Sequence, residues 1–190
     1  MTYEQFLVPI DILFGDCPPL AERLWIHRPY SSYEVLISTA EYIIFPIGNG
    51  KISHQETFAP SSRVNGGLPL TEHEILQVVD AAPRLGTPVT MLPYMSKDEQ
   101  TRGDLSSQVP IEQHTLIMTL RRLEQLNKAY EQKYGFRFVL FVDGRTRAEI
   151  VPIMEERLAH GQRDQEMRIA LEYIIAIARS RLHKLQRSKL

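Results

Sequence analysis

Residues 126–185 read LNKAYEQKYGFRFVLFVDGRTRAEIVPIMEERLAHGQRDQEMRIALEYIIAIARSRLHKL, and this stretch predicts a mostly helical fold. Two sets of residues, one ending with Tyr134 and the other with Leu185, recur at alternating steps of three and four residues. That spacing places them on one face of a helix. The two faces consist of Leu116, Leu120, Leu123, Asn127, Tyr130 and Tyr134, and of Leu171, Ile174, Ala178, Arg181 and Leu185.

Each of these two faces contains one residue that does not suit a core, Asn127 in the first and Arg181 in the second. Burying a polar or charged group costs several kcal/mol, at least roughly, unless it is paired. Both positions therefore indicate a site inside the fold.

The whole-chain composition describes an ordinary globular protein. The chain has 190 residues, 43% of them hydrophobic and 24% charged, with a formal net charge of −1, so nothing points to a nucleic-acid partner. Cys17 is the only cysteine, which excludes an internal disulfide and suits a reducing compartment. We expect an all-α fold with one domain over residues 1–185 and a flexible tail over residues 186–190.

Local signals divide the rest of the chain into helices and loops. Two prolines within Asp16 to Pro19 forbid a continuous helix. Residues 45–70 are rich in Gly, Pro, Ser and Asn and indicate a long irregular loop. Phe136 to Val142 has strand-like composition but no partner strand, so we expect an extended connector. Capping boxes at Ser31–Glu34 and Thr71–Glu74 predict the starts of two helices, and Gly86 is expected to stop the second of them. Pro110 suits the first turn of the long helix that Gly135 caps. We expect a further helix over 147–160, closed by Gly161, and a last helix from about Asp164.

Motifs of the commonest catalytic centres are absent. The chain has no glycine-rich phosphate loop, no GxSxG and no HExxH pair, and its six histidines are scattered without the spacing of metal ligands. No metal site is expected. The chain ends in Ser188-Lys189-Leu190, the tripeptide that the peroxisomal import receptor reads, so we expect a peroxisomal location.

Several segments together resemble the 2-oxo-4-hydroxy-4-carboxy-5-ureidoimidazoline (OHCU) decarboxylases. They are LNKAYEQKYGFRFVLFVDGR from Leu126, the pattern I-x-x-x-M-E-E-R-L from Ile150, and E-x-x-x-A-L-E-x-I-x-x-I-A-x-x-R-L from Glu166. Ala81 to Gly86 and Ser96 to Gln100 extend the resemblance upstream. FVDGRTR and the long middle loop are most similar to fungal members.

The resemblance implies a compact all-α bundle, usually a homodimer and often peroxisomal. It also implies a cofactor-free enzyme that converts its ureidoimidazoline substrate to (S)-allantoin in urate degradation. The expected chemistry is orientation of the scissile bond, stabilisation of the developing anion and delivery of a proton to one face.

The family's motifs also assign roles to residues of this chain. Glu99 matches the catalytic carboxylate, whereas Ala82 stands where the family has its catalytic histidine. Arg137 replaces the proline of a phenylalanine-proline-phenylalanine sequence, a milder departure. We expect Arg181, Asn127 and Glu99 to meet at one cavity. The substrate-binding positions implied by the resemblance are Pro83, Ser96, Gln100, Phe138, Val139, Leu140, Phe141, Val142 and Arg181.

Two explanations for Ala82 remain open. One is an engineered inactivation of a normal decarboxylase. The other is a native homologue that has lost or changed its chemistry, as a binding protein or a different small-molecule enzyme. Retention of Ser96, Glu99, Gln100 and Arg181 favours the decarboxylase interpretation, although a salt bridge from Arg181 to Glu172 or Glu99 would also explain the arginine. A non-enzymatic helical interaction module ranks third.

Overall fold

The structure is a computed structural model that describes residues 1–45, 69–87, 89–106 and 113–187. The described residues form α-helices and one short 3-10 turn, with no β-strand among them, as the all-α prediction requires. The elements are α1 (Tyr3–Phe14), α2 (Pro18–Ile26), α3 (Tyr33–Ile44), α4 (Glu72–Asp80), η1 (Val89–Met91), α5 (Tyr94–Ser106), α6 (Gln113–Tyr134), α7 (Arg147–His160) and α8 (Arg163–Arg187).

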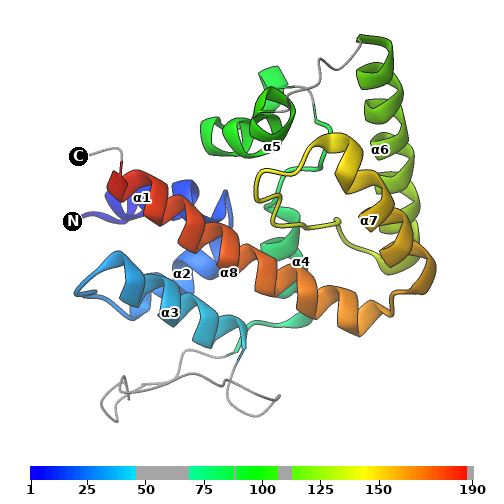
Figure 1. The fold of residues 1–190 in the computed structure, drawn as a ribbon. Helices are drawn as coiled ribbons and strands as arrows, with labels where there is room; N and C mark the ends of the chain where they lie inside the picture. Colours follow the sequence, from blue (N-terminus) through cyan, green and yellow to red (C-terminus); the bar gives the residue numbers. More distant parts are fainter. Residues whose placement is uncertain (46–68, 88, 107–112, 188–190) are drawn as a thin grey trace, which may run out of the picture.

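Helix α8 crosses the middle of the molecule and organises the other helices (Figure 1). It packs against α1, α3 and α4, while α6 packs against α7 and α5 also contacts α7. In α8, Leu171, Ile174, Ala178 and Arg181 are buried, and in α6 so are Leu123, Asn127, Tyr130 and Tyr134. The two helical faces predicted from the spacing are therefore confirmed at these positions, whereas Leu116, Leu120 and Leu185 of the same faces are only partly buried.

Threonine capping boxes begin three of the helices. Thr2 and Gln5 cap α1, Thr71 and Glu74 cap α4 as predicted, and a third box precedes α7. The box predicted at Ser31–Glu34 is wrong by one residue. Ser32 is the extended N-cap of α3, and its side chain accepts a hydrogen bond from the Val35 N–H at 3.3 Å.

Gly86 does not stop α4, contrary to the prediction. The helix ends at Asp80, because Pro83 disfavours helical backbone at Ala82 and cannot itself donate a backbone hydrogen bond. Residues 81–87 instead form an irregular segment, which we call the 81–87 turn. Gly86 has φ +82° there, a conformation in which a side chain at this position would be strained.

Between α6 and α7, residues Phe138–Val142 belong to no helix and pair with no described strand, as expected for the predicted connector, and we call them the extended segment. Phe136 and Phe138 are buried against Tyr130, with ring centroids 5.9 and 5.1 Å away. Aromatic packing therefore fixes the start of this segment onto α6.

Several predicted features lie outside the described residues: most of the 45–70 loop, Pro110, and Ser188-Lys189-Leu190. Helix α8 continues through Arg187, so Gln186 and Arg187 are helical where a flexible tail was expected. No described helix has the length and hydropathy needed to cross a membrane.

Candidate active site

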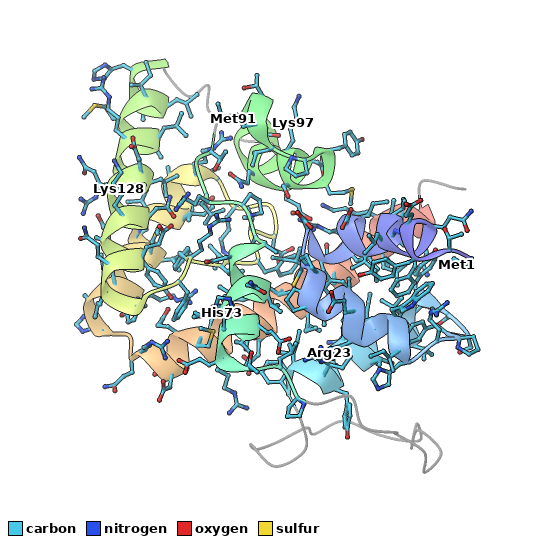
Figure 2. The ribbon with its side chains drawn as sticks, turned by 180° about the vertical axis from the view of Figure 1, so that it is seen from behind. Met1, Arg23, His73, Met91, Lys97 and Lys128 are labelled. Carbon is cyan, nitrogen blue, oxygen red and sulfur yellow. The ribbon has the colours of Figure 1, made fainter. Side chains whose placement is uncertain are left out.

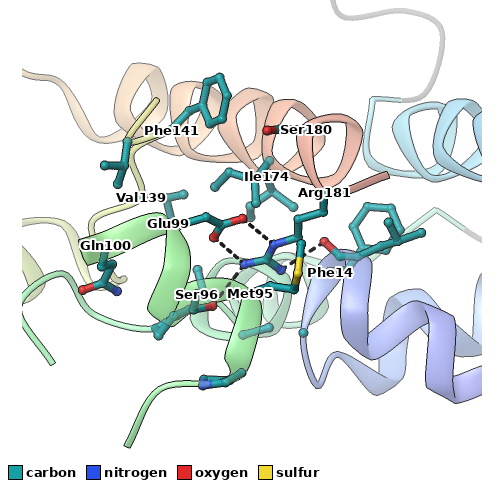
Figure 3. A pocket seen from close by; sticks show the side chains of 18 of the residues that line it. Phe14, Met95, Ser96, Glu99, Gln100, Val139, Phe141, Ile174, Ser180 and Arg181 are labelled. Atoms are coloured by element: carbon teal, nitrogen blue, oxygen red, sulfur yellow. Dashed lines mark hydrogen bonds and ion pairs between the residues drawn. The ribbon is translucent and has the colours of Figure 1, made fainter. Parts of the chain in front are cut away.

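A cavity of about 670 Å³ lies between the end of α1, the 81–87 turn, α5, the extended segment and α8 (Figure 3). This volume is within the roughly 300–1,000 Å³ that is usual for small-molecule sites. The cavity wall includes every residue to which the family resemblance assigned a catalytic or binding role: Ala82, Pro83, Ser96, Glu99, Gln100, Phe138, Val139, Leu140, Phe141, Val142 and Arg181. The roles of these residues stay predictions, but one cavity brings them together.

Arg181 is the most heavily bonded side chain in the cavity wall. Its Nε and Nη2 donate to the two carboxylate oxygens of Glu99, each at 2.8 Å, and Nη2 also donates to Ser96 Oγ at 3.1 Å. Its Nη1 donates to the Ile12 and Leu13 carbonyls, both at 3.2 Å. A guanidinium has five N–H groups, and each of the five in Arg181 therefore has an acceptor. Arg181 therefore joins α8 to α5 and to the last turn of α1.

Glu99 and Arg181 form a largely buried ion pair, with 16% and 8% of their side chains exposed. Figure 3 shows the Glu99 carboxylate between Arg181 and the extended segment. A carboxylate oxygen that accepts one hydrogen bond keeps a lone pair for a second donor. Glu99 can therefore accept a hydrogen bond from a ligand while it remains paired with Arg181.

Position 82 lies on the 81–87 turn, which side chains from two helices hold in place. Gln100 of α5 accepts from the Gly86 N–H at 3.1 Å and donates to the Arg84 carbonyl at 3.2 Å. Arg84 forms a two-point ion pair with Glu131 of α6, at 2.6 and 2.8 Å. The hydrogen bonds and ion pair that hold the turn thus do not involve the side chain of Ala82.

Asn127 does not line the cavity, contrary to the prediction. It lies on α6 behind the turn, where its Nδ2 donates to the Leu85 carbonyl at 2.9 Å. Its Oδ1 is buried and has no hydrogen-bond partner among the described residues. Helical spacing correctly indicated a buried polar residue here, but it could not indicate that the partner is backbone rather than ligand.

The two departures from the family's motifs lie in contact with each other. Arg137 Nη1 donates to the Ala82 carbonyl at 3.1 Å and also to the Asp80 carbonyl, while the Arg137 N–H donates to Asp80 Oδ1 at 3.2 Å. A proline at position 137 could make none of these bonds. Arg137 thus ties the extended segment directly to the residue that replaces the family's histidine.

Two arginines that sequence reasoning did not single out bind the carbonyl groups of the extended segment. Arg157 Nη1 donates to the Val139 carbonyl at 3.2 Å, and Arg145 Nη1 donates to those of Phe141 and Val142, both at 3.1 Å. Arg157 belongs to the quoted M-E-E-R-L pattern. That pattern is the sequence signal that marks this residue, although it does not indicate the residue's partner.

None of the described histidines lines the cavity. His73 lies on the exposed side of α4, where its Nε2 is 3.2 Å from the Gln77 amide nitrogen. His54, in the long loop, lies outside the described residues. Within the described ranges no three His, Cys, Asp or Glu side chains are grouped to hold a metal ion.

Comparisons with known proteins agree with this geometry. A uric acid degradation bifunctional protein from Bacillus sp. (strain TB-90) is 29% identical over 187 residues, which is 98% of this chain but 31% of that protein. The chain thus spans about a third of that relative. The 2-oxo-4-hydroxy-4-carboxy-5-ureidoimidazoline decarboxylases of Halalkalicoccus jeotgali and Amia calva are 26% and 24% identical, over 96% of this chain and 85% and 88% of theirs.

A crystal structure of OHCU decarboxylase in the presence of (S)-allantoin superposes with a TM-score of 0.61 at 20% identity, covering 97% of this chain and 98% of that one. That likeness shows a shared fold. The profile of the OHCU decarboxylase family matches residues 1–183, nearly the whole chain. The chain therefore belongs to the OHCU decarboxylase family.

Proposed function

We propose that the cavity binds the ureidoimidazoline substrate of the family and that the chain decarboxylates it to (S)-allantoin at a reduced rate. The observation that carries this proposal is the cavity wall, which gathers every position to which the family resemblance assigns a catalytic or binding role. It combines an ion pair, a hydroxyl, an amide and extended backbone within a mostly apolar wall. Such a wall suits a small, flat, polar ligand rich in carbonyl and N–H groups.

The proposed reaction breaks the bond between the substrate's carboxylate carbon and its ring carbon. Carbon dioxide leaves, and the electron pair stays on the ring carbon, where the neighbouring ring and ureido groups delocalise it until a proton is added. Donors fixed in the cavity stabilise the developing charge. Of the family's two proton-transferring groups this chain keeps Glu99, which as a carboxylate would take a proton from the ligand or from water and pass it to the ring carbon. Because Arg181 holds Glu99 at two points, the direction of that carboxylate is set before the ligand binds.

The second candidate function is a native homologue in which the same pocket serves binding or different chemistry. The second departure, Arg137, favours it, because a histidine-to-alanine substitution alone would leave the family's proline at position 137, and Arg137 binds the main chain of residue 82. This candidate and the first share one ligand class and differ in whether turnover follows binding.

Binding is tested by calorimetry with (S)-allantoin in buffer that contains a chelator. The unmodified chain is expected to bind, whereas an Arg181→Ala variant is expected to lose binding, since Glu99 and Ser96 lose the group that aligns them. Arg179→Ala is the matched control, because Arg179 is exposed on the same helix and pairs with Glu41. Equal heats for the Arg181 and Arg179 variants would remove Arg181 from the site.

We also propose peroxisomal import through Ser188-Lys189-Leu190 and a homodimer in solution. The first is supported by the tripeptide itself and the second by the family resemblance, with Met91 and Tyr94 as large exposed apolar side chains at 75% and 83%. A fluorescent fusion that stays cytosolic with the tripeptide intact would refute the first proposal. Light scattering that gives the mass of a single chain would refute the second.

A further inference from the structure

A second buried ion pair, Arg157 with Glu166, lies behind the cavity without lining it. The two side chains are 13% and 3% exposed, and Arg157 Nε donates to Glu166 Oε2 at 2.7 Å. The Tyr130 hydroxyl donates to the same oxygen at 2.6 Å. Burial raises the pKa of Tyr130, and the bond to Glu166 raises that pKa further, so the phenol stays a donor. Residues of α6, α7 and α8 thus meet at one carboxylate.

Arg157 reaches from this pair to the cavity wall. Its Nη1 donates to the Val139 carbonyl at 3.2 Å, and its guanidinium carbon lies 4.5 Å from the centre of the Phe138 ring. Phe138 and Val139 both line the cavity, whereas Arg157 and Glu166 do not. Figure 2 shows the fold from behind, with side chains filling the space between α6 and α7. The guanidinium therefore holds the extended segment from outside the cavity.

This contact fixes the direction of a peptide group in the cavity wall. In a trans peptide the carbonyl of one residue and the N–H of the next point to opposite sides. Because the Val139 carbonyl points at Arg157, the N–H of Leu140 points the other way. In the described part of the chain, no acceptor bonds the backbone N–H groups of residues 138–142. The segment thus keeps donors that are unused within the protein.

We propose that Arg157, held by Glu166 and Tyr130, is a positioning residue that turns the peptide groups of the extended segment so that N–H donors face the ligand. The inference rests on the proposed function, in which the cavity binds a ureidoimidazoline. Arg157 touches no ligand in this scheme and acts through the Val139 carbonyl. Glu166, which also accepts from the Tyr130 hydroxyl, fixes the guanidinium, and Nη1 of that guanidinium fixes the peptide group of Val139.

An Arg157→Lys variant separates positioning from mere structural support. A lysine keeps the positive charge beside Glu166 but lacks the planar fork that reaches Glu166 and Val139 together. We expect the melting temperature to stay close to that of the unmodified chain, with (S)-allantoin affinity about tenfold weaker, the value of one lost hydrogen bond. The Leu140 amide resonance is expected to shift.

Arg23→Lys is the matched control, because Arg23 of α2 pairs with Glu74 of α4 at 17% and 22% exposure, and neither residue lines the cavity. It should alter neither affinity nor the Leu140 resonance. If Arg157→Lys does not fold, Glu166→Gln, which keeps the shape of the acceptor, takes its place with the same expected results.

The outcomes separate this inference from the proposed function. Unchanged affinity and an unchanged Leu140 resonance in Arg157→Lys would overturn the positioning role. Failure of the unmodified chain to bind (S)-allantoin would overturn the proposed function instead. If the unmodified chain does not bind, the Leu140 resonance alone decides the inference. A shift confined to the Arg157 variant would support the inference, and no shift would overturn it.

Discussion

An Ala82→His variant is expected to form (S)-allantoin about 10²–10⁴-fold faster than the unmodified chain, the usual contribution of a positioned general acid or base. The reason is that the turn carrying residue 82 is already held by Gln100, by the Arg84–Glu131 pair and by Arg137. The new side chain would project from a position in the cavity wall. The assay generates the unstable substrate from urate in place and follows the circular dichroism of the product.

Two control variants make this gain interpretable. Ala82→Asn places a polar side chain at the same position without a group that titrates near neutral pH, so it should leave the rate low. His73→Ala should behave like the unmodified chain, because His73 lies on the exposed side of α4 and not in the cavity wall. If Ala82→His folds and binds (S)-allantoin but stays inactive, the site serves another purpose and the second candidate function takes its place.

Periodicity was enough to predict the helices that build the core. The spacing along α6 and α8 marked buried faces, and threonine capping boxes stand at the starts of α4 and α7. A predicted helix start was wrong where a neighbouring residue offered the same capping group. At α3, Ser31 and Ser32 both offer a hydroxyl, and only the backbone conformation selects Ser32.

The site residues that could be predicted from the sequence were those marked by helical spacing or by a motif of the family. Arg181 was marked both by its place on a buried face and by the family's motif. Asn127 had the first mark but bonds the Leu85 carbonyl, because helical spacing reports burial and not the identity of the partner. Arg157 and Arg137 bind main-chain carbonyls far away in sequence, and such contacts leave no periodic trace. The contacts of these two arginines behind the cavity wall therefore needed the structure.

Replacing Arg181 with methionine is expected to lower the free energy of unfolding by about 3–5 kcal/mol, the cost of breaking a buried ion pair from one side. The loss is large because Glu99 keeps a charge that is 16% exposed, and because the Ile12 and Leu13 carbonyls at the end of α1 lose their donor. Arg179→Met is the control on the same helix. Its partner pair with Glu41 is 54% and 33% exposed, so the expected change is within about 1 kcal/mol. Denaturant unfolding at neutral pH measures both.

Adding Glu99→Gln to the Arg181→Met variant then shows whether the unpaired charge causes the loss. The double variant should be more stable than the sum of the two single changes predicts, by about 0.5–3 kcal/mol, because no carboxylate is left buried without a partner. Its (S)-allantoin binding should stay lost, since neither the fork of Arg181 nor the charge of Glu99 is restored. Strict additivity, or an Arg181→Met cost no greater than that of Arg179→Met, would mean that the pair does not join α1, α5 and α8. The cavity would then owe its shape to the apolar wall alone.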